Sequence, residues 1–459
     1  MSRACTTYGA ETWTRTISYL TLAFICYSLP SVVFAASTSA DSNNLLRIEG
    51  SNTVGAQLAP ALAKGLFEEQ GFGSIRIESG VADNEQIVRA RSQDGREVSI
   101  TVAAHGSGTG FSALSTGNAE LAASSRPIKD IEAQSLSRFG DMRSYTAEHI
   151  IALDGLAIIL HPRNPLNSLS TAELAKVFAG EITDWAQLGA PAGGIRLYAR
   201  DDNSGTFDTF NELILSGHGK ALSSHAKRFE SSNALSDGVS QDINAIGFIG
   251  LPYIRQAKAV AVSSGSAQAM LPSQSQIATE DYPLSRRLFL YQVPGQESPW
   301  AQAFVAFSQS PRGQAIVEQT GFIPQTIQPL STDLNPEMPE NYQELVKKAK
   351  RLSVNFRFQE GSAVLDNKAR RDLLRLGVYL KASATPANKL VLVGFGDPKT
   401  DPQRAELLSK LRAMAVRREL QHTGVKVGNF MGVGDDLPVA SNQAEDGRIK
   451  NRRVEVWVY

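Results

Sequence analysis

The sequence has little cysteine and no excess of charge of either sign. Only two cysteines occur among 459 residues, Cys5 and Cys26, and both lie near the N-terminus. If that segment is removed on export, the remaining chain has no cysteine and can form no disulfide. The 46 Lys and Arg residues equal the 46 Asp and Glu residues, so the formal net charge is zero. This balance argues against a nucleic-acid-binding protein and against a highly charged tail.

Long apolar runs are also scarce. One follows two N-terminal arginines over residues 17–34, and Val-Phe-Ala at 33–35 forms a small-residue cleavage pattern. This arrangement predicts a signal peptide over residues 1–35 with cleavage after Ala35. The alternative is a retained anchor helix, although a proline interrupts the run. No later stretch is apolar for long enough to span a membrane. Export without disulfides is typical of the bacterial periplasm.

From residue 45 to about residue 325, strand-like segments alternate with helical ones. Strands are expected at residues 45–49, 74–78, 98–103 and 195–199. Residues 81–96, rich in Asp, Gln and Arg, are expected to form a loop or a short helix. The alternation predicts an α/β architecture with parallel strands.

Three of the strands lead into loops of Gly, Ser and Thr and then into helices. These loops cover residues 50–55, 105–110 and 200–206. Ligands of open α/β sheets bind beyond the carboxyl ends of strands, where the three loops would lie. In the last loop, Arg200 offers a planar fork for two oxygens, Ser204 and Thr206 offer hydroxyls, and Gly205 permits close approach. The pattern favours an oxyanion site at a helix start, and three ordinary glycine-closed turns remain the alternative.

Several motifs together resemble the periplasmic phosphate-binding proteins of phosphate ABC transporters. They are Gly-Ser-Asn-Thr at 50–53, Ser-Gly-Thr-Gly at 107–110, Ala-Ser-Ser-Arg-Pro at 123–127, Arg-x-Asp-x-Ser-Gly-Thr at 200–206, and the stretches 153–158, 178–185, 244–249 and 282–286. The resemblance covers residues 45–325. It implies a periplasmic-binding-protein fold of two α/β lobes, joined by crossover strands, that closes on one anion. It also implies that Asp202 orients Arg200. The implied phosphate-binding residues are Thr53, Val54 through its backbone N–H, Ser107, Ser125, Arg200, Asp202, Ser204, Gly205 and Thr206.

One position departs from that family. Where its best-known members have an aspartate that accepts a hydrogen bond from a protonated phosphate oxygen and repels fully ionised sulfate, this chain has Ser125. A serine can donate or accept a hydrogen bond, so it does not distinguish a protonated ligand oxygen from an ionised one. The choice between phosphate and sulfate therefore stays open. The neighbouring Arg126 is either a second cation of the site or a surface residue.

A linker rich in Pro, Asp and Asn is expected over residues 326–343. Residues 344–459 then predict a small α+β two-layer sandwich. Its motifs resemble the peptidoglycan-binding domain at the C-terminus of outer membrane protein A. They are Gly-Phe-Gly-Asp at 394–397, Leu-Ser-x-x-Arg-Ala at 408–413, Gly-Val-Gly at 432–434, Pro-Val-Ala-Ser-Asn at 438–442, Gly-Arg at 447–448 and Asn-Arg-Arg-Val-Glu at 451–455.

The second resemblance implies that Asp397 and Arg412 clasp the amine and the carboxylate of diaminopimelate in the wall peptide. Ala405 stands where the family often has asparagine, so a domain that keeps the fold without binding wall is the alternative. Arg452 and Arg453 serve the fold, the ligand or both.

The six histidines show no metal-ligand spacing, and no nucleophile–base pair points to an enzyme. We therefore expect no metal, no cofactor and no catalysis. The sequence predicts a periplasmic receptor for inorganic phosphate, held at the cell wall or outer membrane by peptidoglycan, with a phosphate ABC permease as a possible partner. The alternatives are a receptor for sulfate or another oxyanion, and a wall-bound structural or sensor protein.

Overall fold

The computed structural model describes residues 43–459, apart from residues 203, 297, 359–361, 363, 384–385, 387–388 and 444. The expected signal peptide and both cysteines lie outside the described residues. Within them, no helix combines the length and apolarity that a membrane crossing requires.

One mixed sheet runs through the first three hundred residues, in the order β2-β3-β4-β1-β5-β13-β6-β10-β8-β9, with β11 paired to β6. Its strands are β1 (Asn44–Gly50), β2 (Gly73–Ser79), β3 (Glu85–Arg91), β4 (Glu97–Ala103), β5 (Leu121–Ser124), β6 (Glu148–Leu160), β8 (Arg196–Arg200), β9 (Lys227–Phe229), β10 (Ala245–Gly250), β11 (Lys258–Ala259) and β13 (Ser285–Tyr291). A separate pair joins β7 (Ser168–Ser170) to β12 (Ala261–Ser263). The helices are α1 (Asn52–Gly55), α2 (Leu58–Glu69), α3 (Ser107–Thr116), α4 (Asp130–Ser135), α5 (Thr171–Phe178), α6 (Gly205–Phe210), α7 (Ser232–Gln241), α8 (Gln274–Ala278), α9 (Pro299–Gln309) and α10 (Pro311–Gln319).

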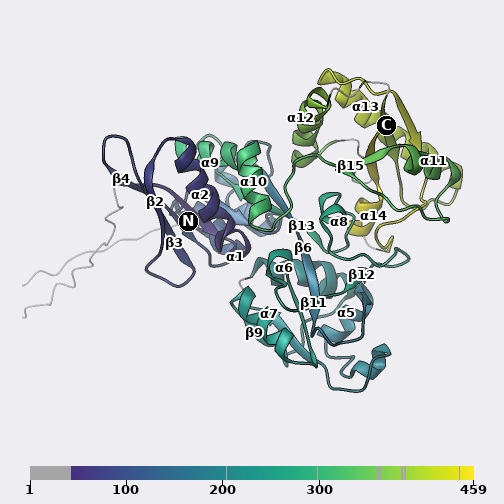
Figure 1. The fold of residues 1–459 in the computed structure, drawn as a ribbon, viewed down its shortest axis with the longest axis horizontal. Coiled ribbons are helices and arrows are strands. Elements are labelled where there is room, and N and C mark those ends of the chain that lie inside the picture. Colours follow the sequence, from purple (N-terminus) through teal and green to yellow (C-terminus); the bar gives the residue numbers. More distant parts are fainter. Residues whose placement is uncertain are drawn as a thin grey trace, which may run out of the picture. The chain divides into compact units, whose positions relative to one another are not determined.

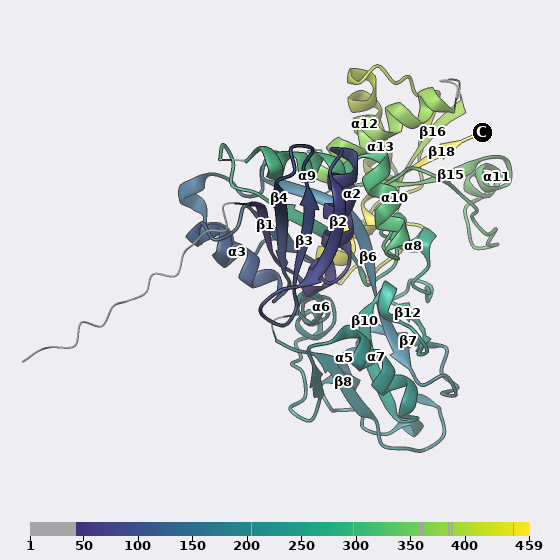
Figure 2. The same ribbon diagram turned by 60° about the vertical axis from the view of Figure 1, so that its left-hand side comes forward.

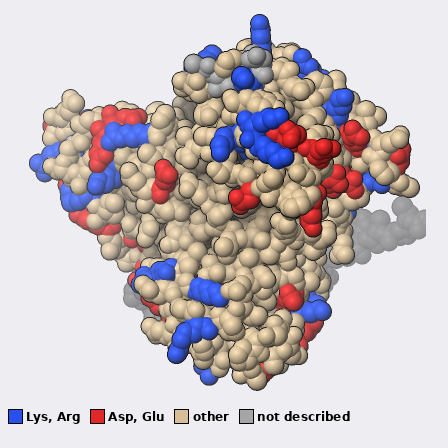
Figure 3. Space-filling model, turned by 45° about the vertical axis from the view of Figure 1, so that its right-hand side comes forward, with Lys and Arg blue, Asp and Glu red and all other residues tan. Residues whose placement is uncertain are grey.

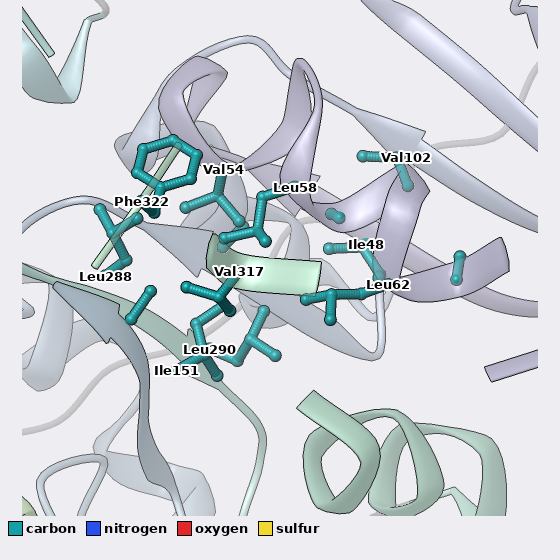
Figure 4. Close-up of a cluster of buried hydrophobic side chains, with 14 of the residues drawn as sticks. Ile48, Val54, Leu58, Leu62, Val102, Ile151, Leu288, Leu290, Val317 and Phe322 are labelled. Atoms are coloured by element: carbon teal, nitrogen blue, oxygen red, sulfur yellow. The ribbon is translucent and has the colours of Figure 1, made fainter. Parts of the chain in front are cut away.

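The first lobe covers both faces of its part of the sheet. Because successive side chains of a strand point to opposite faces, Leu288 and Leu290 of β13 pack on one face, and Phe289 and Tyr291 on the other. The helices α2, α9 and α10 lie together on the first face (Figures 1 and 2). Figure 4 shows the apolar side chains of α1, α2, β1, β13 and α10 pointing toward one another in this core.

Strand β3 corrects the expectation of a loop or short helix over residues 81–96. It pairs antiparallel with both β2 and β4, so the edge of this lobe is antiparallel rather than parallel. Val88 and Ala90 are fully buried at alternate positions, beneath charged neighbours that face outward. Apolar residues at every second position are therefore sufficient for this strand, even when charged residues lie between them.

The second lobe has its own core around β8, β10 and the carboxyl half of β6. The rings of Phe210 and Phe248 stack with centroids 3.9 Å apart, and Phe178 packs edge-on against both. Strand β8 is parallel to β9 and to β10. The segment that follows β8 approaches the first lobe, since Thr206 Oγ1 lies 3.2 Å from Thr53 Oγ1.

The long strand β6 runs through both lobes. All but the first of the thirteen residues of β6 are buried. In its carboxyl half the side chains alternate between the two cores, with Ile159 in the first and Ile158 in the second. Strand β13 lies antiparallel to it, from Ser285 opposite Gly155 to Tyr291 opposite Glu148. The predicted two-lobe α/β fold with crossover strands is confirmed.

The C-terminal residues form a second sheet in the order β14-β15-β18-β16-β17. Its elements are β14 (Pro329–Leu330), α11 (Glu340–Lys348), β15 (Lys350–Arg357), α12 (Asn367–Ala382), β16 (Leu390–Gly394), α13 (Pro402–His422), β17 (Asn429–Gly432), α14 (Glu445–Asn451) and β18 (Arg453–Val458). Apolar residues of α12 and α13 cover one face of this sheet, as the predicted two-layer sandwich requires. Part of the expected linker belongs to this domain, because β14 pairs with β15.

Charges are balanced locally as well as in total. On the face shown in Figure 3, basic and acidic side chains are interspersed, and wide areas carry neither. This distribution gives that face no broad patch of one sign for a polyanion to bind.

Candidate functional site

The loop between β8 and α6 reaches across from the second lobe to the first. Ser204 caps α6, and its hydroxyl accepts the N–H of Thr206 at 3.2 Å. A Cβ atom on Gly205 would lie 2.1 Å from Ser125 Oγ and 2.5 Å from Ser107 Oγ. Both distances are far below van der Waals contact, so glycine is what lets this helix start approach two first-lobe loops.

Hydroxyl groups from both lobes meet at this approach. Thr53 Oγ1 lies 3.2 Å from Thr206 Oγ1. The N–H of Ser125 donates to Ser107 Oγ at 3.2 Å. We call the hydroxyl cradle the group formed by Thr53, Ser107, Ser125, Ser204 and Thr206, all of which are buried. The structure therefore brings together the three loops that the sequence singled out, and the Ser125 loop with them. The side chain of Val54 points into the first-lobe core instead (Figure 4), which leaves its backbone for a ligand.

The cation that contacts the cradle is Arg286, which the sequence reasoning did not assign. Its guanidinium donates to Thr206 Oγ1 at 3.1 Å and to Thr53 Oγ1 at 3.3 Å. It also donates twice to Asp154 Oδ2, at 2.9 and 2.6 Å. The other oxygen of Asp154 accepts the backbone N–H of Leu251 at 3.2 Å. The sequence did offer one signal for this pair, because Asp154 and Arg286 each lie in a strand rich in apolar residues. Charged side chains are rarely buried in such strands unless they pair with one another.

Arg200 is buried at the end of β8, but the predicted partner is wrong. Its guanidinium donates to Phe229 O at 3.1 Å and to Ser232 Oγ at 2.7 Å, and lies 3.5 Å from Asp201. Asp202 was expected to orient it. Asp202 instead has a largely exposed side chain that pairs with Arg228. In a turn, adjacent carboxylates point in different directions, and Asp201 is the one that faces inward.

Arg126 is neither a second cation of the cradle nor a surface residue. It is buried, and its guanidinium donates to Glu132 at 2.7 and 2.8 Å and to Asp208 at 2.8 Å. Burial alone would lower the pKa of Arg126, but these two carboxylates raise it. Since Glu132 lies on α4 and Asp208 on α6, this arginine links the two lobes beside the cradle.

Buried hydroxyls without a partner lie at and beside the cradle. Ser125 Oγ and Tyr253 Oη are both buried and make no hydrogen bond. Tyr253 lies next to the ion pair, since a Cβ on Gly250 would meet Asp154, Arg286 and Tyr253 at 3.1, 3.2 and 3.6 Å. Burial raises the pKa of Tyr253 to about 12, so its hydroxyl is a neutral donor at ordinary pH. Each unsatisfied group costs roughly 1–3 kcal/mol, which an enclosed hydrogen-bond acceptor would offset.

A second charged cluster lies at the end of β16 in the C-terminal domain. Asp397 accepts from Arg452 and from Lys399, each at 2.9 Å, and its other oxygen lies 3.7 Å from Arg412. Burial would raise the pKa of Asp397, but the hydrogen bonds from Arg452 and Lys399 hold it well below its usual range. The predicted pair, Asp397 and Arg412, is brought together, and Arg452 joins it.

Close packing of α13 on β16 determines where the side chains of this second cluster lie. A Cβ on Gly394 would lie 1.9 Å from Ser409 O, so glycine allows the helix to touch the strand and holds Arg412 above its end. Arg453, in contrast, stacks on Phe395 with 3.8 Å to the ring centroid and donates to Glu455 at 3.0 Å. Arg453 therefore serves the packing of the domain, whereas Arg452 faces the cluster.

Comparison with known proteins finds a family for each of the two parts of the chain. Residues 63–312, more than half of the chain, match the PBP superfamily domain. The chain belongs to the PBP superfamily. Residues 357–452 match the OmpA family, and this range contains the residues of the second cluster.

Curated relatives of this PBP-superfamily chain resemble its two-lobe part. Protein SphX of Synechococcus elongatus is 33% identical over 254 residues, which cover 52% of this chain and 73% of SphX. The phosphate-binding protein PstS of Bacillus subtilis is 29% identical over 277 residues, or 60% of this chain and 87% of PstS. The solved structure of an ABC-type phosphate transport receptor from Vibrio cholerae superposes with a TM-score of 0.47 at 23% identity, over 61% of this chain and 99% of that chain.

The groups of the hydroxyl cradle are suited to form hydrogen bonds with a ligand. The cradle offers hydroxyls, which donate or accept, and a guanidinium, which donates only. Across the described ranges, no group of three or more His, Cys, Asp or Glu side chains is placed to hold a metal ion. A small tetrahedral oxyanion, with acceptor oxygens on every side, matches such a set of converging donors.

Proposed function

We propose that this chain is a periplasmic receptor for inorganic phosphate, held at the cell wall through its C-terminal domain. The observation that carries the proposal is the hydroxyl cradle, in which buried donors from both lobes converge on one point beside Arg286. Phosphate-binding proteins among the relatives support phosphate as the ligand. Delivery to a phosphate ABC permease is the role that fits such a receptor.

Phosphate is retained by donated hydrogen bonds and excluded from water as the lobes close around it. Such closure is a hinge motion between lobes that surround the ligand. Ser125 stands where a carboxylate would reject fully ionised sulfate, and its Oγ has no partner. We therefore expect weaker discrimination against sulfate than a buried carboxylate would give.

Calorimetry of the protein with phosphate and with sulfate, between pH 5 and 8, tests the ligand. The matched variants are Thr53→Val and Thr206→Val, which remove one hydroxyl each with little change of shape. Each lost bond to a charged ligand should weaken phosphate binding by about 10- to 100-fold. Thr116→Val, at the exposed end of α3, is the control and should bind as the parent does. If the protein bound sulfate more tightly than phosphate at both ends of the pH range, the assignment of phosphate as the ligand would be wrong and sulfate would take its place.

The wall anchor has its own test. Asp397 and Arg412 present opposite charges side by side, which complements a zwitterion such as diaminopimelate. Sedimentation with purified wall sacculi should retain the parent and the control Arg404→Ala, and should release Asp397→Asn and Arg412→Ala. Equal retention of all four proteins would contradict the proposed wall anchor. The alternative would then be a domain that keeps the fold without binding the wall.

A further inference from the structure

The C-terminal domain contacts both lobes of the receptor. Its helix α12 binds the first lobe, where Asn367 donates to Glu148 Oε1 at 3.0 Å and Arg371 donates to Glu148 O at 3.1 Å. Arg371 also lies 2.9 Å from His149 Nδ1. Glu148 and His149 begin β6, the strand that runs through both lobes. The first lobe is therefore held at the entrance to the crossover.

A different element holds the second lobe. Three side chains of β15 bind Asp281. Its carboxylate accepts hydrogen bonds from Arg351 at 2.6 Å, from Asn355 at 3.0 Å and from Arg357 at 3.1 Å. Asp281 follows α8, whose apolar residues belong to the second core. Any movement of one lobe relative to the other must therefore strain or break one of these two sets of contacts.

The strand that carries Arg286 is held from outside by the same domain. Lys450 of α14 donates to Tyr282 O at 2.9 Å and to Pro283 O at 2.7 Å, just before β13 begins. Arg287, next to Arg286, pairs with Asp366 at 2.7 Å. Successive side chains of a strand point to opposite sides, so Arg286 reaches the cradle while Arg287 reaches the C-terminal domain.

The same short segment reaches the second charged cluster. Lys450 and Arg452 are two residues apart, and Arg452 donates to Asp397 at 2.9 Å. One continuous set of contacts therefore runs from Asp397 through Arg452 and Lys450 to the residues that precede Arg286. Coupling between distant sites is carried by such packed and hydrogen-bonded networks when the elements in them have two arrangements. The proposed function supplies two such arrangements, the open and the closed lobes.

We propose that the C-terminal domain clamps both lobes, and that occupancy of the anion cradle and of the Asp397 cluster are thermodynamically coupled through Lys450. The inference rests on the proposed function, because it takes phosphate for the first site and a diaminopimelate peptide for the second. Coupling is reciprocal, so each ligand must change the affinity of the other by the same factor. Lys450 acts as a positioning residue and touches neither ligand.

The test is a thermodynamic cycle on the full chain. Calorimetry measures the Kd of phosphate without and with a saturating soluble wall peptide that carries meso-diaminopimelate, and the Kd of that peptide without and with phosphate. We expect a change of about 5-fold or more, equal in both directions. Lys450→Met keeps the apolar stem of the side chain but removes the hydrogen-bond donor. The variant should bind each ligand alone, while the factor by which one ligand changes the Kd of the other falls to one. Lys347→Met, on the exposed α11 pair with Glu344, is the matched control and should keep the factor.

The outcomes separate the two proposals. If both ligands bind the parent and neither changes the Kd of the other, the coupling is overturned and the proposed function stands. If Lys450→Met keeps the full factor, Lys450 is not the link and the inference as stated fails. If phosphate does not bind the parent at all, the receptor proposal falls, and the coupling falls with it.

Discussion

At the residue scale, the ion pair of Arg286 and Asp154 controls both stability and the expected binding. The two side chains are 3% and 0% exposed, and their closest atoms are 2.6 Å apart. Replacing Arg286 by methionine removes the partner of a buried carboxylate, which should lower the free energy of unfolding by roughly 3–5 kcal/mol. Urea unfolding followed by circular dichroism measures this loss.

A double variant separates stability from binding. Arg286→Met with Asp154→Asn leaves no uncompensated buried charge, so most of the lost stability should return. The donors to Thr53 and Thr206 remain absent, so phosphate affinity should stay low. If the double variant bound phosphate as the parent does, Arg286 would be a structural residue alone.

At the scale of the element, the approach of α6 to α3 is set by Gly205. Gly205→Ala should weaken phosphate binding by at least about 10-fold, because its Cβ would clash with Ser125 Oγ and Ser107 Oγ, at 2.1 and 2.5 Å. Overpacking at a buried site costs roughly 1–3 kcal/mol, and thermal unfolding measures this loss of stability. Gly108→Ala in α3 is the control, since its nearest neighbour, Glu132, is 3.8 Å from the added Cβ. An equal loss of affinity in both variants would contradict a role for close approach.

The same scale shows what sequence patterns can and cannot predict. The strands expected at residues 45–49 and 195–199 are β1 and β8, and the loops of Gly, Ser and Thr predicted the loops that form the cradle, because both kinds of signal are local. Strand β3 was missed because its few apolar residues lie among charged ones. Arg286 was missed for a different reason: its partners, Thr53, Asp154 and Thr206, lie far from it in the chain. Asp201 and Asp202 could not be told apart, because the direction of a turn side chain depends on its surroundings.

At the scale of the whole molecule, charged groups join the C-terminal domain to the two-lobe part of the chain. Asp281 lies at the centre of this junction, with a side chain that is 2% exposed. Burial would raise the pKa of Asp281, but Arg351, Arg453 and Arg357 lower it from 3.8 to about 2. A carboxyl whose pKa is depressed by folding stabilises the folded state above its unfolded pKa and loses this contribution as the pH falls. The junction should therefore weaken between about pH 4 and pH 2.

Comparison with Asp281→Asn isolates this contribution from that of other carboxylates. The parent should lose roughly 2 kcal/mol more unfolding free energy than the variant between pH 5 and pH 2, as the shift in pKa requires. Urea unfolding at a series of pH values measures the two slopes. Glu68→Gln, in an exposed pair with Arg312, should leave the slope of the parent almost unchanged, because exposed pairs contribute little. Equal slopes for the parent and Asp281→Asn would mean that the junction holds without this carboxylate, and that apolar contacts rather than charge unite the two parts.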